Sequence, residues 1–412
     1  MLQTATPAIA RGNGRSYGDS SLNPDLTLSL LGLDRMLAFD AASGVLVCEA
    51  GVLLSDVIET FLRRGWFAPV TPGTRFVTVG GMIASDVHGK NHRAGSFGDH
   101  LAWLDLAVGP GRVLRCSPTD NAELFAATCG GMGLTGVILR AAFRMARVET
   151  AAMRQRTLHA RGLDECLELL GASRDWTYSV AWIDCLATGR SLGRSVVTLA
   201  EHAVRDELPA AMRETPFRRP PPRARRVPVD FPGFVLSPAS VRVFNQAYYW
   251  AHPSGDELAT LDGYFYPLDG VIDWNRIYGR RGFAQYQCVL PPEQSPQGMR
   301  RLLTAIAGAG DASFLTVLKP MGEQSFGLLS FPRPGFTLAL DFAIKPRTLA
   351  LMDRLDAITA EHSGRLYLTK DSRMSRDMLA SGYPRLEEFR RLRREHGLEA
   401  RFQSLQSKRL EL

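Results

Sequence analysis

Glycine alternates with basic and hydroxyl side chains in a short stretch near the start of the sequence, ARGNGRSYGDSS at residues 10–21. Because glycine has no Cβ, the backbone N–H groups of such a stretch can approach a ligand closely and donate hydrogen bonds to it. Two further glycine clusters lie at residues 72–98 and 130–136. In the second cluster, Gly80 and Gly81 precede an apolar run, which predicts a helix N-terminus directed toward an anion. Three such clusters within the first third of the chain favour one site for a pyrophosphate over unrelated tight turns.

The common nucleotide-binding and metal-binding motifs do not account for these residues. The sequence contains no GxxxxGK[ST] pattern, and the spacing of GNGRSYG differs from GxGxxG, so a Rossmann site is disfavoured. His88 and His92 are four residues apart, as metal ligands often are. They lie in a glycine-rich segment without the glutamate of an HExxH motif, so we expect no metal there.

The segments around the later glycine clusters predict alternating strands and helices. Residues 101–118 predict a hairpin that turns at Gly109-Pro110-Gly111. Residues 121–145 predict a helix, a glycine-rich turn and a strand. Residues 215–233 are rich in arginine and proline and predict an extended loop, since proline disrupts helices and central strands.

The second half of the chain predicts an antiparallel sheet with helices. Residues 283–291, 313–321 and 336–344 read as strands, and the last two alternate between apolar and polar side chains. That alternation is typical of a sheet with one covered face. A helix is expected at about 347–362, and the tail from 384 to 412 is expected to be helical and basic.

The composition fits an ordinary globular protein of two domains. The chain has 412 residues, of which 45% are hydrophobic and 22% are charged. Its six cysteines are scattered without a CxxC pair, which favours a reducing compartment over a disulfide framework. With no signal peptide and no apolar run of transmembrane length, we expect a cytoplasmic location. The net charge of +7 permits binding to anionic lipid, phosphorylated ligands or nucleic acid without distinguishing among them.

Four segments together resemble the vanillyl-alcohol-oxidase-type flavoproteins: RGNGRSYGDSS, PGTRFVTVGGMIASDVHGKNHRAGSFGDH, AELFAATCGGMGLTGVI, and GRLYLTKDSRMS with the later YPRLEEF. The combination of HGKNH with KDSR narrows the resemblance to the oxidising subunits of decaprenylphosphoryl-β-D-ribose 2′-epimerases. It extends over nearly the whole chain. The family implies an α+β fold of two lobes, a PCMH-type FAD-binding domain plus an antiparallel-sheet substrate domain. It places the FAD-binding domain at 1–148, the substrate-binding cap at 149–364 and a return to the FAD-binding domain at 365–412.

The resemblance implies an FAD-dependent oxidoreductase acting on CH–OH donors. The family reaction oxidises the 2′-hydroxyl of a polyprenyl-phosphate pentose to a ketone by hydride transfer to flavin N5, as the first half of an epimerisation. It implies a lipid-linked sugar phosphate as substrate, an NAD(P)H-dependent short-chain reductase as partner, a quinone-like electron acceptor and contact with the inner membrane, without nucleic acid. Two alternatives stay open: a soluble polyol or aldonolactone oxidase that uses oxygen, and a non-catalytic basic protein that binds membranes or nucleic acid through 215–226.

The resemblance also implies roles for individual residues. Lys370 would lie beside the flavin, where a fixed ammonium group stabilises the negative charge that hydride transfer places on the ring. His88 matches an active-site position, and its imidazole could accept or orient the hydroxyl proton. The general base stays open among His88, Lys370 and a water, and Tyr17 completes the predicted catalytic set. Gln285 and Gln287 alternate along one strand, so both should face the sugar. Trp182 would either line the pocket or belong to the core.

The predicted sets are larger than these examples. Cofactor binding is expected from Arg11, Gly12, Asn13, Gly14, Arg15, Ser16, Tyr17, Pro72, Gly73, Thr74, Thr78, Gly80, Gly81, Ser85, His88, Gly89, Asn91, Gly130, Gly133, Gly136, Val137, Ile138, Tyr367 and Lys370. Substrate binding is expected from Lys90, Trp182, Gln285, Gln287, Lys319, Ala339 and Tyr367.

Three features depart from the family pattern. Arg15 stands where many superfamily members carry a histidine bonded to the flavin, so FAD is expected to be held without a covalent bond. Ala339 stands where the mycobacterial enzymes carry the cysteine that nitroaromatic inhibitors trap, which predicts resistance to such trapping. Family members usually have a further segment before the first glycine motif, so the first strand of the FAD lobe is expected to be missing.

Overall fold

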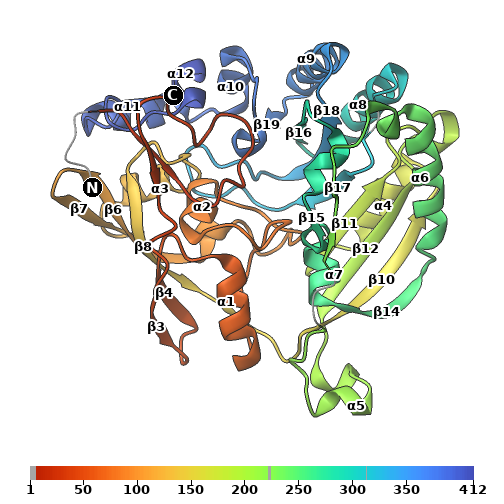
Figure 1. Ribbon diagram of the computed structural model, residues 1–412, viewed down its shortest axis with the longest axis horizontal. Helices are drawn as coiled ribbons and strands as arrows, with labels where there is room; N and C mark the ends of the chain where they lie inside the picture. The colour runs from red at the N-terminus through yellow and green to blue at the C-terminus, as the bar shows by residue number, and fades with distance from the viewer. Residues whose placement is uncertain (1–5, 221–223, 312) are drawn as a thin grey trace.

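The computed structural model describes residues 6–220, 224–311 and 313–412 and contains two large antiparallel sheets (Figure 1). The smaller sheet has five strands in the order β3-β4-β8-β6-β7, and the larger has eight in the order β14-β10-β12-β11-β17-β18-β16-β19. Three two-stranded pairs, β1-β2, β5-β9 and β13-β15, complete the strands of the described residues. This mixture of helices and antiparallel sheets confirms the predicted α+β class.

The elements have the following bounds. The strands are β1 (Ile9–Arg11), β2 (Thr27–Ser29), β3 (Met36–Asp40), β4 (Val45–Glu49), β5 (Trp66–Phe67), β6 (Leu101–Gly109), β7 (Arg112–Cys116), β8 (Val137–Arg144), β9 (Ala146–Arg147), β10 (Ala152–Ala160), β11 (Tyr178–Ile183), β12 (Ser195–His202), β13 (Arg225–Arg226), β14 (Gly255–Thr260), β15 (Val271–Ile272), β16 (Phe283–Leu290), β17 (Thr316–Met321), β18 (Gly335–Ala343) and β19 (Arg365–Leu366). The helices are α1 (Leu54–Phe61), α2 (Val79–Ala84), α3 (Ala122–Thr128), α4 (Leu163–Ala172), α5 (Ala210–Arg213), α6 (Pro238–Ala251), α7 (Leu261–Phe265), α8 (Ser295–Ala309), α9 (Pro346–Glu361), α10 (Arg376–Gly382), α11 (Leu386–Glu395) and α12 (Leu405–Leu410), and the 3₁₀ turns used below are η5 (Gly233–Leu236) and η7 (Trp274–Tyr278).

The five-stranded sheet forms the side of the molecule that holds the glycine clusters. The predicted hairpin is present as β6 and β7, and the predicted helix, turn and strand are present as α3 and β8. Helix α1 is amphipathic and buries Leu54, Val57, Ile58 and Phe61. All six cysteines are buried and unpaired. Helix α2 lies within the second glycine cluster and has contacts with β8, so this sheet positions the cluster.

The eight-stranded sheet is covered on one face by α4, α8 and α9, which contact its strands. The residues of β18 alternate between the covered face and the opposite face of this sheet. Leu338 and Leu340 are fully buried in the core, while Ala339 between them points to the opposite face and is only partly buried. The strand and helix predictions for this half are confirmed by β16, β17, β18 and α9, whose observed bounds lie within a few residues of the expected ones. The face of the sheet opposite these helices carries Gln285, Gln287 and Lys319.

The C-terminal segment returns to the first third of the chain. The N–H of Ala8 donates to Arg401 O at 2.8 Å, and the N–H of Tyr17 donates to Thr369 O at 2.9 Å. The buried guanidinium of Arg393 donates to Leu134 O at 3.0 Å. Figure 1 accordingly shows α11 and α12 beside the N-terminal strands. These contacts join residues beyond 365 to the glycine-rich side, while the predicted domain boundaries at 148 and 364 stay predictions.

The arginine-proline segment is anchored where the structure describes it. Arg219 forms ion pairs with Glu59 at 2.8 Å and with Asp262 at 2.7 Å. Arg225 and Arg226 form β13, which pairs in parallel with β15. Residues 221–223 of the predicted loop lie outside the described residues. Among the helices of the described residues, none combines the length and apolar character needed to cross a bilayer.

Candidate active site

The first glycine cluster presents free backbone donors. Within the described residues, the N–H groups of residues 12–16 have no acceptor in the protein, whereas the next residue, Tyr17, is hydrogen-bonded to Thr369. The side chains around this turn hold its shape: Arg11 donates to Ser21 Oγ at 2.9 Å, and Asn13 donates to Phe76 O at 2.8 Å. A run of unpaired N–H groups on a glycine-rich turn is what an anion such as a pyrophosphate requires.

The second cluster packs against the first instead of offering free donors at its helix. The N–H groups of Val79, Gly80 and Gly81 donate to Val52 O, Ala50 O and Thr78 Oγ1 at 2.9, 2.8 and 3.1 Å. The free helix N-terminus expected from the sequence is therefore not available, because those donors are used inside the protein. A Cβ at Gly12 would lie 2.2 Å from Thr78 Oγ1, so only glycine permits this approach of the two loops.

The third cluster closes around the other end of α2. Gly130 and Gly133 have φ values of +79° and +78°, which favour glycine. The N–H of Gly130 donates to Ile83 O at 3.0 Å, and that of Met132 donates to Ala84 O at 2.9 Å. The adjoining Val137 and Ile138 are buried at the start of β8, below Gly136. The fold thus gathers all three glycine clusters around one short helix.

His88 is the centre of a buried polar group that faces these clusters. Its Nδ1 lies 2.9 Å from Lys319 Nζ, and its Nε2 lies 3.1 Å from Gln287 Nε2. Lys319 also donates to Gly89 O at 2.6 Å, and Gln287 also donates to Thr337 Oγ1 at 3.2 Å. Predicted residues from the HGKNH motif and from two strands of the large sheet therefore meet at one imidazole.

Lys370 occupies a second polar group, together with a residue that the sequence analysis missed. Its Nζ lies 4.1 Å from the centroid of the Tyr17 ring. The missed residue is Asp341, which is fully buried on β18 and accepts a hydrogen bond from Gln285 Nε2 at 2.6 Å. One signal in the sequence could have found it, because an aspartate inside the apolar run FTLALDFAI is unusual in a covered strand.

Burial perturbs the pKa values of His88, Lys319, Lys370 and Asp341. Burial and the charge of Lys319 lower the pKa of His88 well below its usual value. Burial lowers the pKa of Lys319 to about 7, assisted by repulsion from Lys90 and Lys370. For Lys370, burial lowers the pKa to about 8 against the opposing effect of Asp341, whose own pKa burial raises to about 7. Such concentrated shifts are typical of functional sites.

Tyr367 and Ser85 connect the two polar groups to the glycine clusters. The Tyr367 hydroxyl donates to Ser85 O at 3.0 Å, and its ring stacks on Phe331 with centroids 4.5 Å apart. The same ring lies 5.2 Å from the His88 ring. Tyr367 is therefore a buried aromatic neighbour of His88.

Other predicted residues lie at the margin or outside this group. Lys90 donates to Tyr264 O, and its Nζ lies 4.4 Å from the Tyr264 ring centroid. Trp182 packs on α6 against Tyr248, with ring centroids 4.4 Å apart, which matches the core alternative for this tryptophan. Asn91 donates to Gly95 O at 3.1 Å. The remaining predicted residues of the loop before α2 are Pro72, Gly73 and Thr74, of which Thr74 accepts from the N–H of Phe76 at 3.3 Å.

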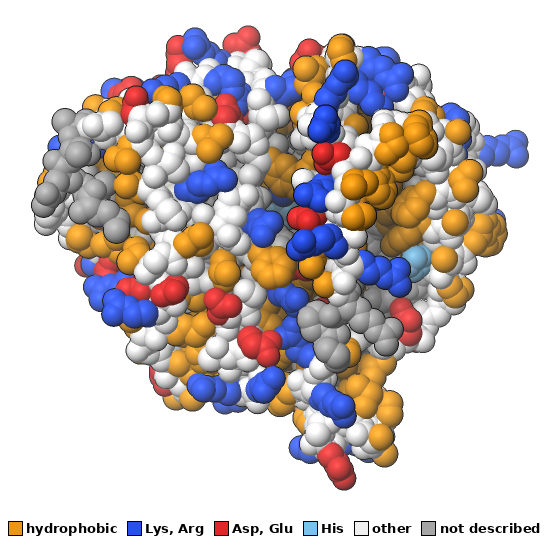
Figure 2. Space-filling model, viewed as in Figure 1, with side chains coloured by type: hydrophobic (Ala, Val, Ile, Leu, Met, Phe, Trp, Pro, Cys, Tyr) orange, Lys and Arg blue, Asp and Glu red, His pale blue; other side chains and the backbone are white. Residues whose placement is uncertain are grey.

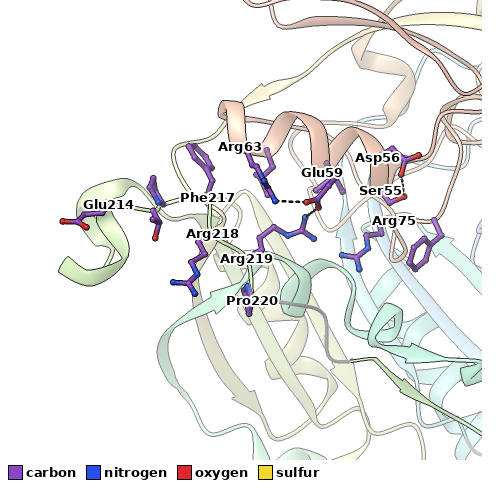
Figure 3. A pocket seen from close by; sticks show the side chains of 15 residues that line it. Ser55, Asp56, Glu59, Arg63, Arg75, Glu214, Phe217, Arg218, Arg219 and Pro220 are labelled. Atoms are coloured by element: carbon purple, nitrogen blue, oxygen red, sulfur yellow. Dashed lines mark hydrogen bonds and ion pairs between the residues drawn. The ribbon is translucent and has the colours of Figure 1, made fainter.

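A large pocket lies elsewhere, between α1 and the arginine-proline segment (Figure 3). Its volume is about 920 Å³. Figure 3 shows Arg63 and Arg219 both directed at Glu59, with which they form ion pairs. The pocket contains none of the residues around His88 and Lys370, and it touches the candidate site only through Phe76, which holds Asn13.

The residues present fit FAD. The unpaired N–H groups of residues 12–16 suit its pyrophosphate, and the buried Lys370 suits the electron-accepting end of a flavin. Near Lys370, the buried oxygens Gln285 Oε1 and Asp341 Oδ2 have no partner within the described residues. Buried polar atoms are normally satisfied, so these are acceptors for a ligand's hydroxyl or N–H groups. Fold and site together define an FAD-dependent oxidoreductase.

Comparisons with known proteins specify the family. Residues 2–117 match the FAD binding domain family. The chain is 36% identical to decaprenylphosphoryl-β-D-ribose oxidase of Mycolicibacterium smegmatis, over 98% of this chain and 89% of that protein. It is also 35% identical to an uncharacterized protein of Streptomyces coelicolor, over 83% of this chain and 95% of that protein. The chain belongs to the decaprenylphosphoryl-β-D-ribose oxidase family.

The same comparisons bear on the two alternatives. Mouse L-gulonolactone oxidase is 30% identical, but over only 31% of this chain and 29% of that enzyme. An aldonolactone oxidase is therefore a distant relative. The non-catalytic alternative was wrong, because the chain is a member of an oxidoreductase family over its whole length.

Proposed function

We propose that this protein oxidises the 2′-hydroxyl of a polyprenyl-phosphate pentose to a ketone. The observation that carries the proposal is the meeting of His88, Lys319 and Gln287 in one buried group on the face that also holds Lys370. Such a group offers several donors and acceptors to a sugar, and the sugar is named in the relative that matches most of this chain. The reaction is the first half of an epimerisation, which an NAD(P)H-dependent short-chain reductase would complete.

The protein's own groups have distinct tasks in this reaction. FAD, when bound, supplies the acceptor for the hydride that leaves the sugar carbon. The N–H groups of residues 12–16 would hold its pyrophosphate, and Lys370 would place a positive charge beside its ring. With Arg15 in place of the tethering histidine, binding would be non-covalent. Gln285 and Gln287 would orient the sugar hydroxyls, and Tyr367 would exclude water from the site.

The proton of the reacting hydroxyl needs an acceptor near neutral pH. Because the pKa of His88 is lowered, its protonated imidazolium form is unfavourable near neutral pH, and His88 does not keep that proton. Lys319, with a pKa of about 7 and 2.9 Å from His88 Nδ1, is better matched to neutral pH. We therefore favour Lys319 as the proton acceptor, with His88 Nδ1 and Gly89 O as the acceptors that hold its amino group in place.

Anaerobic bleaching of the flavin tests the proposal. A panel of polyprenyl-phosphate pentoses should bleach it, whereas free pentoses and aldonolactones should not. Substitution Lys370→Met should abolish bleaching, and the control Lys408→Met, at a partly exposed lysine near Asp25, should leave it unchanged. Bleaching by free sugars with peroxide formed in air would instead establish the soluble oxidase.

A further inference from the structure

One surface of the molecule exposes several large apolar side chains to solvent. Phe234 of η5 is 74% exposed, and Val243 and Trp250 of α6 are 71% and 66% exposed. With Phe244 and Ala247 they form what we call the α6 face. Figure 2 shows hydrophobic side chains gathered on the right of the molecule, where Figure 1 places α6.

The exposed apolar residues of α6 are spaced so that they form one stripe along the helix. Val243, Ala247 and Trp250 follow one another at four and three residues, so they share one side of the helix. The other side buries Val241 and Tyr249 against the large sheet. A surface helix normally has a single apolar stripe that faces the core. A second stripe toward solvent, joined to Phe234, indicates a surface that is covered in use.

Exposed arginines lie on α6 and on segments that connect to η5. Arg242 lies on α6 itself, and Arg280 and Arg281 follow η7, which contacts η5. Arg225 and Arg226 lie on β13, whose partner strand β15 precedes η7. All five are exposed. Arg226 pairs with Asp273 at 3.5 Å and Arg280 with Asp230 at 4.0 Å. Exposed ion pairs of this kind are weak, so these cations can exchange partners readily.

A row of aromatic rings connects the α6 face to the candidate active site. Phe244 contacts Phe314, with ring centroids 5.9 Å apart, and Phe314 stacks on Tyr278 at 5.6 Å. Tyr278 stacks on Phe283 at 4.6 Å, and Phe283 meets Tyr17 edge-on at 5.4 Å. The ammonium group of Lys370 lies over the ring of Tyr17. Four ring contacts therefore connect Phe244 of the α6 face to Tyr17, the ring beneath Lys370.

We infer that the α6 face docks on a lipid bilayer containing anionic headgroups and so presents the active site to a membrane-anchored substrate. The inference rests on the proposed function, since a polyprenyl chain keeps its sugar phosphate at the membrane surface. Aromatic side chains partition well into the headgroup region, and arginines around them attract anionic lipids. A docking surface beside the site lets the sugar reach Lys370 while its chain stays in the bilayer.

Vesicle binding of the purified flavoprotein tests the inference without turnover. The probe is vesicles of phosphatidylcholine in which about 30% of the lipid is phosphatidylglycerol. The measurement is co-sedimentation of the protein with the vesicles. The protein should bind to these vesicles. About 0.5 M NaCl, a few times the physiological ionic strength, should weaken binding because salt screens the charges. Val243→Asp and Trp250→Ser should each weaken the partition coefficient by about tenfold or more. The matched control is Val113→Asp on β7, at 51% exposure on the opposite side of the molecule, which should bind as the parent does (Figure 1).

Two further measurements separate the outcomes. Light scattering reports whether the α6 face is covered by a second copy: a dimer that Trp250→Ser dissociates would overturn the membrane inference. Equal binding of the parent, Val243→Asp and Val113→Asp, or no binding by the parent, would overturn it as well. Flavin bleaching by a short-chain, water-soluble polyprenyl-phosphate pentose should be equal in all variants. If that substrate fails with the parent while vesicle binding depends on Val243, the proposed function fails and the docking surface stands.

Discussion

Replacement of Asp341 by asparagine tests whether this buried carboxylate keeps Lys370 charged. Burial brings the pKa of Lys370 to about 8, so about three-quarters of the lysine is protonated at pH 7.5. The charge of Asp341 opposes that loss. Removal of a nearby opposite charge lowers a lysine pKa by about 1–3 units, which would leave about a quarter or less of it protonated. We expect kcat/KM at pH 7.5 to fall about threefold or more.

The pH dependence makes the expectation specific. The alkaline limb of the kcat/KM profile should move to lower pH in Asp341→Asn by about one unit or more. Below about pH 6 the two profiles should converge, because the pKa of Asp341 in the parent is about 7 and its carboxyl is then neutral. An alkaline limb that does not move would refute the electrostatic link between Asp341 and Lys370.

The substitution Asp341→Asn should lower activity without lowering the stability of the folded protein. The folded-state pKa of Asp341 is raised from 3.8 to about 7, so the contribution of this carboxyl to stability is lost as pH rises from about 4 to about 7. The shift corresponds to at most about 4 kcal/mol and already includes the opposing attraction of Lys370. Asparagine avoids this cost, so Tm at pH 8 should not fall. The control Asp105→Asn removes a buried carboxylate that pairs with Arg115 and Arg140, and it should lower Tm without moving the pH profile.

Other predictions concern the cofactor and the missing cysteine. Gly12→Ala should weaken FAD retention after dialysis by about tenfold or more, since its Cβ would collide with Thr78, whereas Gly32→Ala, with open space at that Cβ and outside the predicted site, should retain FAD. Equal retention by both variants would contradict the packing of the two loops. Acid precipitation should release all flavin into the supernatant, as Arg15 predicts, and flavin left in the pellet would show a covalent bond. Ala339→Cys should form an adduct with a nitroaromatic inhibitor during turnover, seen by mass spectrometry, and the parent should not.

Local patterns in the sequence predicted most of the elements and part of the site. Strands β16, β17 and β18 and helix α9 were predictable because apolar periodicity is a property of neighbouring residues. The glycine clusters were recognisable because the need for close approach and positive φ limits which residue can stand there. The helix N-terminus at Gly80 was misjudged, since its donors are satisfied by the distant Ala50 and Val52, which no local pattern reveals.

Sequence alone determined the residue types that this chemistry needs: glycines for an anion, and His88 and Lys370 in motifs of one flavoprotein family. Only the tertiary structure decided how they act. Lys319 reaches His88 across 231 residues of sequence, and Asp341 becomes the electrostatic partner of Lys370 through strand pairing and burial. The physical reason is that pKa values depend on desolvation and on charges a few ångströms away, and both arise only when distant segments pack together.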